Sequence, residues 1–129
     1  MKADLHNHSY YSDGVLSPSE VVKLASKAGC DLFSLTDHDT TNGIDEAKLE
    51  ADKLNLNLIN GVEISALWRN MAIHILGLGI DINNDILQTG LEHNQKLRKE
   101  RAEKIALGLW RSGIKDALEK TQSFSKTDM

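Results

Sequence analysis

Cysteine, proline and aromatic residues are rare in the sequence. Among its 129 residues are one cysteine, one proline, and two each of tryptophan, tyrosine and phenylalanine. A single cysteine, Cys30, excludes both an internal disulfide and a structural zinc site built from several cysteines. This usage fits a reducing compartment, so we expect a cytoplasmic protein in which Cys30 is a buried structural thiol.

Long apolar runs and an excess of positive charge are also absent. No apolar stretch approaches the roughly 18 residues of a membrane-spanning helix, and the N-terminus lacks the apolar core of a signal peptide. The net charge is −4 and the pI is near 5.7, which gives no global basic field. We therefore expect no membrane association and no stable binding of duplex DNA. The rest of the composition is typical of one modest globular domain.

Short apolar segments alternate with amphipathic ones along the first 80 residues. This pattern predicts the order β-α-β-α-β-β-α, an α/β fold with a parallel layer or barrel. The expected strands cover residues 2–6, 31–39, 56–65 and 71–80, and the third of them is expected to end at Glu63.

The boundaries of the first two helices carry recognisable signals. A serine–proline pair at 17–18, followed by Glu20, is typical of a capping box with proline in the first helical position. Gly29 is a plausible C-cap for the same helix. Thr40 or Thr41 is expected to cap the second helix.

A helical and highly charged region is predicted at about 83–113, and an irregular tail at 114–129. The helical spacing of four apolar residues predicts one buried face, formed by Leu97, Ala102, Ile105 and Leu109. No further strand follows, and a closed α/β barrel needs a longer chain. We therefore expect a fragment or a truncated gene product, whose exposed apolar surface would favour oligomerisation.

Side chains that commonly bind metal ions lie at the ends of the predicted strands or within them. His6 and His8 lie two residues apart in an extended segment, so they point to the same side. Ligands from separate strands converge at one rim in parallel α/β folds. Histidine and carboxylate together suit zinc, manganese or iron. The candidate residues are His6, His8, Asp13, Asp37, His38, Asp39, Glu63 and His74.

Each of these residues, taken alone, also has an ordinary structural explanation. His6 and His8 would make a surface pair, and residues 37–39 a solvated turn that caps a helix. Glu63 would be a salt-bridge partner, and His74 a core histidine among aliphatic neighbours. Their joint position at one rim is what favours a metal centre.

Four segments resemble successive motifs of the PHP family, the polymerase and histidinol phosphatase superfamily. They read DLHNHSYYSDG, SLTDHDT, GVEIS and IHILGLG, and the resemblance extends over residues 3–113. They are most similar to the TrpH-type branch of stand-alone nucleotide phosphoesterases, which includes nucleoside 3',5'-bisphosphate phosphatases and a 5'-to-3' exoribonuclease. The resemblance implies a distorted seven-stranded α/β barrel. Residues 1–129 would then form the N-terminal portion of such a PHP domain.

The resemblance also implies up to three divalent ions (manganese, iron or zinc) and hydrolysis of nucleotide or short RNA phosphate esters by metal-activated water. Matched motif by motif, His6 and His8 would hold a first ion. Asp13 and His38 would belong to a second. The family's later motifs, which supply further ligands, are not found after His93, so we expect this chain alone to be a poor catalyst or inactive.

Four further residues receive roles from the same resemblance. Glu63 would bridge two ions, and His74 would help hold a third. Asp37 and Asp39 flank His38 and would orient it without binding metal.

The charged helix has two interpretations. In the first, its basic residues and His93 form a solvated surface balanced by nearby glutamates. In the second, Arg98 and Arg101 bind a substrate phosphate, because an arginine fork matches phosphate oxygens. At the level of function, the alternatives are a histidinol-phosphate-type phosphatase and an inactive metal-binding fragment.

Overall fold

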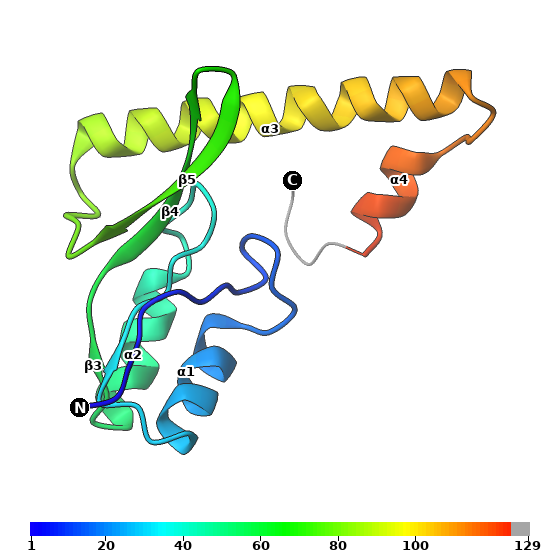
Figure 1. Cartoon of the computed structure of the whole chain (residues 1–129). Coiled ribbons are helices and arrows are strands. Elements are labelled where there is room, and N and C mark those ends of the chain that lie inside the picture. Colours follow the sequence, from blue (N-terminus) through cyan, green and yellow to red (C-terminus); the bar gives the residue numbers. More distant parts are fainter. Residues whose placement is uncertain (125–129) are drawn as a thin grey trace.

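A computed structural model describes residues 1–124 of the chain and confirms a mixed α/β fold (Figure 1). Its elements follow in the order β1 (Ala3–Asp4), α1 (Pro18–Lys27), β2 (Leu32–Phe33), α2 (Ile44–Lys53), β3 (Asn57–Leu58), β4 (Gly61–Trp68), β5 (Met71–Leu78), α3 (Asp85–Arg111) and α4 (Ala117–Gln122). None of the helices in this described part is both long and apolar enough to cross a membrane.

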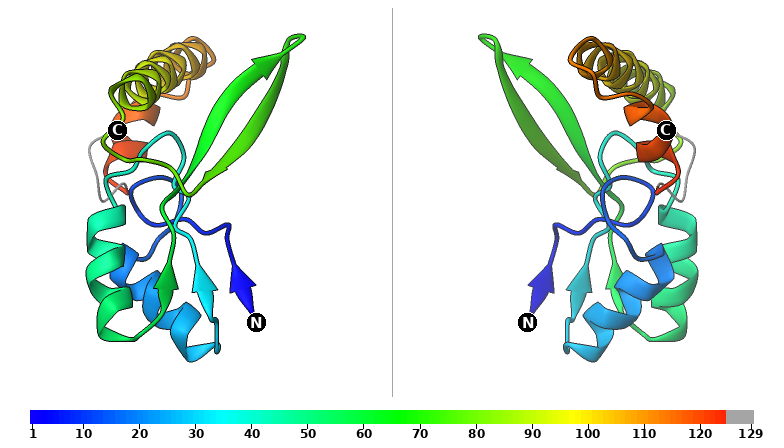
Figure 2. Two further views of the ribbon diagram at one scale, coloured as in Figure 1. Left: turned by 90° about the vertical axis from the view of Figure 1, so that its left-hand side faces the viewer. Right: turned by 90° about the vertical axis from the view of Figure 1, so that its right-hand side faces the viewer.

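Three very short strands form the base of the molecule. β1, β2 and β3 pair in parallel in that order, and α1 and α2 both lie on one side of them (Figure 2). The buried core between helices and strands consists of Val22, Ala25, Phe33, Leu35, Ala47, Ala51 and Leu56. Cys30, expected to be buried, is half-buried against this core.

The predicted capping box at the start of α1 is confirmed, whereas the C-cap is Ala28 and not Gly29, which follows it. The Ser17 hydroxyl accepts a hydrogen bond from the Glu20 backbone N–H at 3.2 Å, and the Glu20 carboxylate accepts one from the Ser17 N–H at 2.8 Å. At the other end, Gly29 adopts a left-handed φ of 77°, and the Cys30 N–H reaches the Ala25 carbonyl at 3.1 Å. This pairing is a Schellman motif, which satisfies carbonyls that the helix leaves without partners.

Several boundary predictions were wrong. The strands predicted at 2–6 and 31–39 are much shorter, Ala3–Asp4 and Leu32–Phe33. The cap of α2 is Gly43, without a side-chain hydrogen bond, and not Thr40 or Thr41. The strand predicted at 56–65 is two strands, β3 and β4. A Cβ on Gly61 would lie 2.2 Å from the Ser34 hydroxyl, so this close approach requires glycine where β4 begins.

β4 and β5 form an antiparallel hairpin rather than parallel strands, which corrects the prediction for this pair. Its two-residue turn places Arg69 at φ 46° and Asn70 at φ 64°, as in a type I′ turn. In consequence Glu63 is the third residue of an eight-residue strand and not the end of a strand. The hairpin extends beyond the parallel strands, and its far end lies apart from α3 (Figure 2).

The prediction for the charged helix was half right. α3 does run through most of the region at 83–113, but its expected buried face is largely uncovered, with Leu97 48 % and Ile105 56 % exposed. Leu91 is the buried residue of this helix. The tail expected to be irregular contains α4, and its residues 125–129 lie outside the described part of the chain.

The capping box at α1 yields a stability prediction. Replacing Ser17 by alanine should lower the free energy of unfolding by about 1 kcal/mol, because the N–H of Glu20 loses its acceptor. The measurement is the urea-unfolding midpoint. Ser26→Ala, near the other end of the same helix, is the control and should change it by under about 0.5 kcal/mol; equal effects of both substitutions would contradict the cap.

Candidate metal centre

Glu63 is held in place by backbone pairing between β4 and the segment that follows β2. The Asp39 N–H donates to the Glu63 carbonyl at 2.9 Å, and the Glu63 N–H donates to the Asp37 carbonyl at 3.2 Å. This parallel bridge sets His38 directly beside Glu63. These bonds fix the backbone of Glu63, and the position of its carboxylate follows from that.

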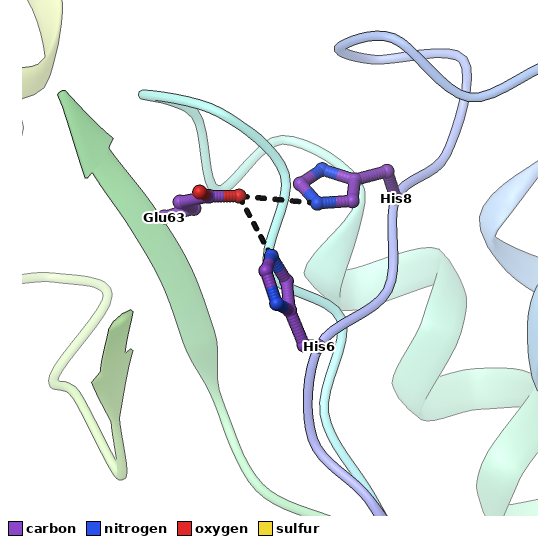
Figure 3. Close-up of side chains that lie close together, drawn as sticks. All are labelled: His6, His8 and Glu63. Carbon is purple, nitrogen blue, oxygen red and sulfur yellow. Dashed lines mark hydrogen bonds and ion pairs between the residues drawn. The ribbon is translucent and has the colours of Figure 1, made fainter. Parts of the chain in front are cut away.

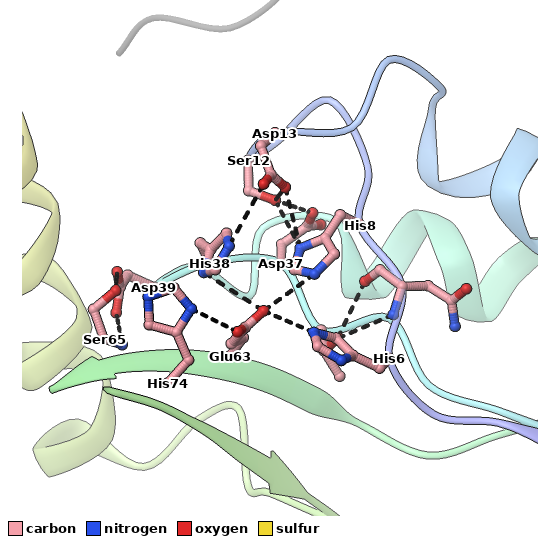
Figure 4. Close-up of polar contacts among 12 residues, drawn as sticks. His6, His8, Ser12, Asp13, Asp37, His38, Asp39, Glu63, Ser65 and His74 are labelled. Atoms are coloured by element: carbon pink, nitrogen blue, oxygen red, sulfur yellow. Dashed lines mark hydrogen bonds and ion pairs between the residues drawn. The ribbon is translucent and has the colours of Figure 1, made fainter. Parts of the chain in front are cut away.

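Imidazole rings converge on this carboxylate, which is almost fully buried (Figures 3 and 4). Glu63 Oε2 lies 2.9 Å from His6 Nε2 and 3.1 Å from His8 Nε2. Glu63 Oε1 lies 2.8 Å from His74 Nδ1. His74 thus points to the cluster and not into the apolar core, as the alternation of side chains along β5 requires.

A loop brings Asp13 to the far side of the same cluster. Its Oδ1 lies 3.3 Å from His8 Nδ1, and its Oδ2 lies 3.6 Å from His38 Nε2. The chain can return this closely because Gly14 has no side chain: a Cβ there would lie 2.4 Å from the His8 carbonyl oxygen.

These side chains fit a group of divalent cations. Three overlapping sets have their donor atoms within 4.8 Å of one another: His6, His8 and Glu63; His8, Asp13 and His38; and His38, Glu63 and His74. The buried Nδ1 of His38 has no hydrogen-bond partner among the described residues, and it faces Glu63 Oε2 at 3.6 Å. A buried polar atom that lacks a partner beside a carboxylate is consistent with a site that binds ions.

The protonation states favour metal binding. Burial lowers the pKa of His38 below its ordinary value, so the ring is neutral at pH 7 and has a free lone pair. For Glu63, burial acts to raise the pKa, but the hydrogen bond with His6 and the nearby His38 outweigh it and hold the pKa below the ordinary value. A neutral imidazole and an ionised carboxylate are the ligand forms of these residues.

Comparison with known proteins identifies the family. The PHP domain model matches residues 4–116. The chain belongs to the PHP domain family. It is 44% identical over 118 residues to a 5'-3' exoribonuclease of Haemophilus influenzae, covering 92% of this chain and 43% of that protein. It is 42% identical over 111 residues to a 3',5'-nucleoside bisphosphate phosphatase of Chromobacterium violaceum, covering 86% and 39%.

A solved structure supports the same fold. An amidohydrolase from Chromobacterium violaceum, with bound sulfate and no metal, superposes with a TM-score of 0.93 at 37% identity, covering 98% of this chain and 45% of that one. The chain thus spans about two fifths of the length of the curated relatives described above.

In this PHP domain, Asp37 has a different task from the one expected. It was predicted to orient His38, but its carboxylate accepts hydrogen bonds from the loop that carries Asp13. The donors are the Ser9 N–H at 2.7 Å, the Ser9 hydroxyl at 2.7 Å and the Ser12 hydroxyl at 2.6 Å. Asp37 therefore shapes the His8–Asp13 loop.

Asp39 also differs from its prediction. Its fully buried carboxylate accepts hydrogen bonds from the Ser65 N–H at 2.8 Å and hydroxyl at 2.7 Å, from Asn94 Nδ2 at 2.9 Å and from Arg98 Nε at 2.6 Å. Burial acts to raise the pKa of Asp39, but the bonds from Ser65 and Arg98 hold it below the ordinary value of 3.8. Asp39 thus joins β4 to α3, and the backbone that follows His38 is fixed as a result.

The two arginines proposed for phosphate are in different situations. Arg98 donates a hydrogen bond from Nε to Asp39 and one from Nη2 to the Ser65 hydroxyl at 2.8 Å. These two contacts join parts of the fold to one another. Arg101 is exposed one turn further along α3. Both line a pocket of about 540 Å³ that also reaches Asp13 and His38.

Sequence reasoning missed the serines that organise the centre. Ser9, Ser12 and Ser65 each bond a carboxylate more than 20 positions away in sequence. No local pattern distinguishes them from loop or strand serines, because their importance depends on pairing across the fold.

The Asp39 network yields a prediction on stability and pH. Asp39→Ala should lower the free energy of unfolding by roughly 2–4 kcal/mol, because it leaves Arg98 and the Ser65 N–H without their acceptor. Asp52→Ala, at an exposed position of α2, is the control and should cost under about 0.5 kcal/mol. Urea unfolding measures both.

The lowered pKa of Asp39 determines how the stability difference between wild type and Asp39→Ala depends on pH. A depressed folded-state pKa stabilises the protein above the unfolded value of 3.8, and the contribution is lost as pH falls through the folded pKa. The gap between wild type and Asp39→Ala should therefore be full at pH 6 to 7 and should shrink below about pH 4. A gap that stays constant down to pH 2 would contradict the ionised network.

Proposed function

We propose that this chain supplies the metal-binding part of a phosphoesterase that hydrolyses phosphate esters of nucleotides or short RNA ends. The observation that carries the proposal is the buried Glu63 carboxylate with imidazole nitrogens at 2.8–3.1 Å on both of its oxygens. The two relatives described above, an exoribonuclease and a nucleoside bisphosphate phosphatase, support the substrate class. The single cysteine supports a cytoplasmic setting.

The residues that would hold divalent ions follow from the three sets of donors. We assign His6 and His8 with Glu63 to one ion, and Asp13 with His38 to another. His74 would share Glu63 with a third. Zinc, manganese and iron all accept this mixture of nitrogen and oxygen ligands. When bound, such ions supply positive charge for phosphate oxygens and lower the pKa of water to near neutrality.

The remaining residues of the pocket would bind the substrate. Arg101, Lys99 and Arg98 present positive charge beside Asp13 and His38, where a phosphate group would lie. Asp37 and Asp39 contribute indirectly, because they hold the loop and the helix that border this pocket.

A histidinol-phosphate-type phosphatase of the same family is the second candidate, and an inactive metal-binding fragment is the third. The names of the relatives favour nucleotides over histidinol phosphate. In this assignment one ion has three side-chain donors among the described residues and the other two ions have two each, so we expect slow turnover.

The test is hydrolysis by the 129-residue chain with added Mn²⁺, followed as release of inorganic phosphate and, for the RNA substrate, also as release of mononucleotides. The substrates are a nucleoside 3',5'-bisphosphate, a short 5'-phosphorylated RNA and histidinol phosphate. We expect slow release from the nucleotide or RNA substrate that chelator abolishes and fresh Mn²⁺ restores. Preferred cleavage of histidinol phosphate would move the assignment to the second candidate, and no release from any substrate would leave the inactive fragment.

A matched pair of variants excludes a contaminating phosphatase. Glu63→Gln should reduce release at least 100-fold, because a neutral amide replaces the carboxylate shared by the donor sets. Glu92→Gln, exposed on α3, makes the same chemical change away from the cluster and should keep the wild-type rate. Equal rates for all three proteins would contradict the proposed site.

A further inference from the structure

Two apolar residues of α3 that were expected to be buried border the pocket beside the candidate metal centre. Ala102 is half-buried and Ile105 is 56 % exposed, and both line the cavity of about 540 Å³ that reaches Asp13 and His38. A cavity of this size is typical of sites that bind small molecules. A ligand in it would therefore cover apolar surface of α3 that the described residues leave open.

The lining of this pocket changes from charged to apolar along α3. Arg101, Ala102 and Ile105 follow Arg98 at spacings of three, four and seven residues, so all of them lie on one face of the helix. Arg98 is anchored to Asp39, the neighbour of His38 in sequence, and therefore lies at the end of the pocket nearer the metal centre. Ile105 lies two turns further on, a rise of about 10 Å along the helix.

Two further elements supply apolar surface to the same cavity. α4 folds back beneath the C-terminal half of α3 (Figure 1), and its Leu118 and Gln122, one helical turn apart, both line the pocket. The loop that precedes α1 contributes Tyr11. The Tyr11 ring is held in place, because it packs against Tyr10 with ring centroids 4.9 Å apart and against Gly43, where a Cβ would lie 3.1 Å from Tyr11 Cδ2. An aromatic ring and aliphatic side chains suit the faces of a nucleobase, and an amide suits its polar edge.

We propose that Tyr11, Ile105 and Leu118 bind the base of a nucleotide whose phosphate lies at the charged end of the pocket. The order of the two ends matches this ligand, because a nucleotide carries its negative charge at one end and a planar base with apolar faces at the other. The inference rests on the proposed function, since it takes the charged end as the place of the reacting phosphate. These three residues determine specificity and contact no reacting atom.

The test compares two ligands that differ only in the base. They are the phosphonate analogues of adenosine 5'-monophosphate and of ribose 5-phosphate, in which no ester bond can be hydrolysed. Dissociation constants for the 129-residue chain with added Mn²⁺ are measured by isothermal titration calorimetry. We expect the adenosine analogue to bind about 10-fold more tightly than the ribose analogue. Equal dissociation constants, or no binding of either ligand, would overturn the proposal.

Variants locate the base within the pocket. Ile105→Ala and Leu118→Ala should each reduce the preference for the adenosine analogue about threefold, because they remove apolar groups that contact the base. Ile86→Ala is the matched control: it makes the same change on α3 at a position that is 85 % exposed and outside the pocket, and it should keep the wild-type preference. A preference that survives both pocket substitutions, or that falls equally in all three variants, would contradict the proposal.

These outcomes are separable from those of the hydrolysis assay. Hydrolysis of nucleotides without any preference for the base in binding would keep the proposed function and remove the base site. A preference for the base that depends on Ile105 and Leu118, without hydrolysis of any substrate, would remove the proposed function and keep a nucleotide-binding pocket.

Discussion

The carboxylate of Glu63 lies in the interior of the cluster, 4 % exposed, with His6 and His8 on one oxygen and His74 on the other. An ionised carboxylate in such a place is costly unless positive charge or hydrogen bonds compensate it. Imidazole N–H groups compensate it only in part, because an uncharged ring has just one N–H to donate. Cations at this point would satisfy the carboxylate and the imidazole lone pairs together, and this requirement explains why residues from four separate segments meet there.

The segment Asp37–His38–Asp39 organises the rest of the centre. Its backbone pairs with β4 beside Glu63, so His38 is placed by main-chain hydrogen bonds. Its two aspartates then face in different directions: Asp37 holds the loop with Ser12, and Asp39 holds α3 through Arg98. This three-residue segment thereby holds β4, the loop with Ser12 and α3 around the cluster. Such support is what keeps metal ligands within the narrow geometry that an ion requires.

Features that depend on local periodicity could be predicted from the sequence. The spacing of His6 and His8 correctly indicated that both point the same way, and the alternation of β5 indicated that His74 faces away from Ile73 and Ile75. The capping box of α1 also follows from residues that lie close in sequence. These predictions succeeded because the deciding contacts are either local or imposed by strand geometry.

Two of the failures involve contacts between distant segments, and a third involves a turn without its usual residue. The amphipathic face of α3 looked buried, but whether a face is covered depends on a partner, and Leu97 has 48 % of its surface exposed. The roles of Asp37 and Asp39 were assigned from their position beside His38, whereas their actual partners lie 25 to 59 residues away. The hairpin was missed because its turn, Arg69–Asn70, lacks the glycine that usually marks a two-residue loop.

The central claim is that Glu63 and the surrounding imidazoles form a cation site, and anomalous diffraction from crystals of the zinc-loaded chain tests it most directly. The account predicts a zinc peak within about 2.0–2.2 Å of His6 Nε2, His8 Nε2 and a Glu63 carboxylate oxygen. Zinc bound only elsewhere on the surface, for instance at the exposed His93, with no zinc beside these three side chains, would contradict it.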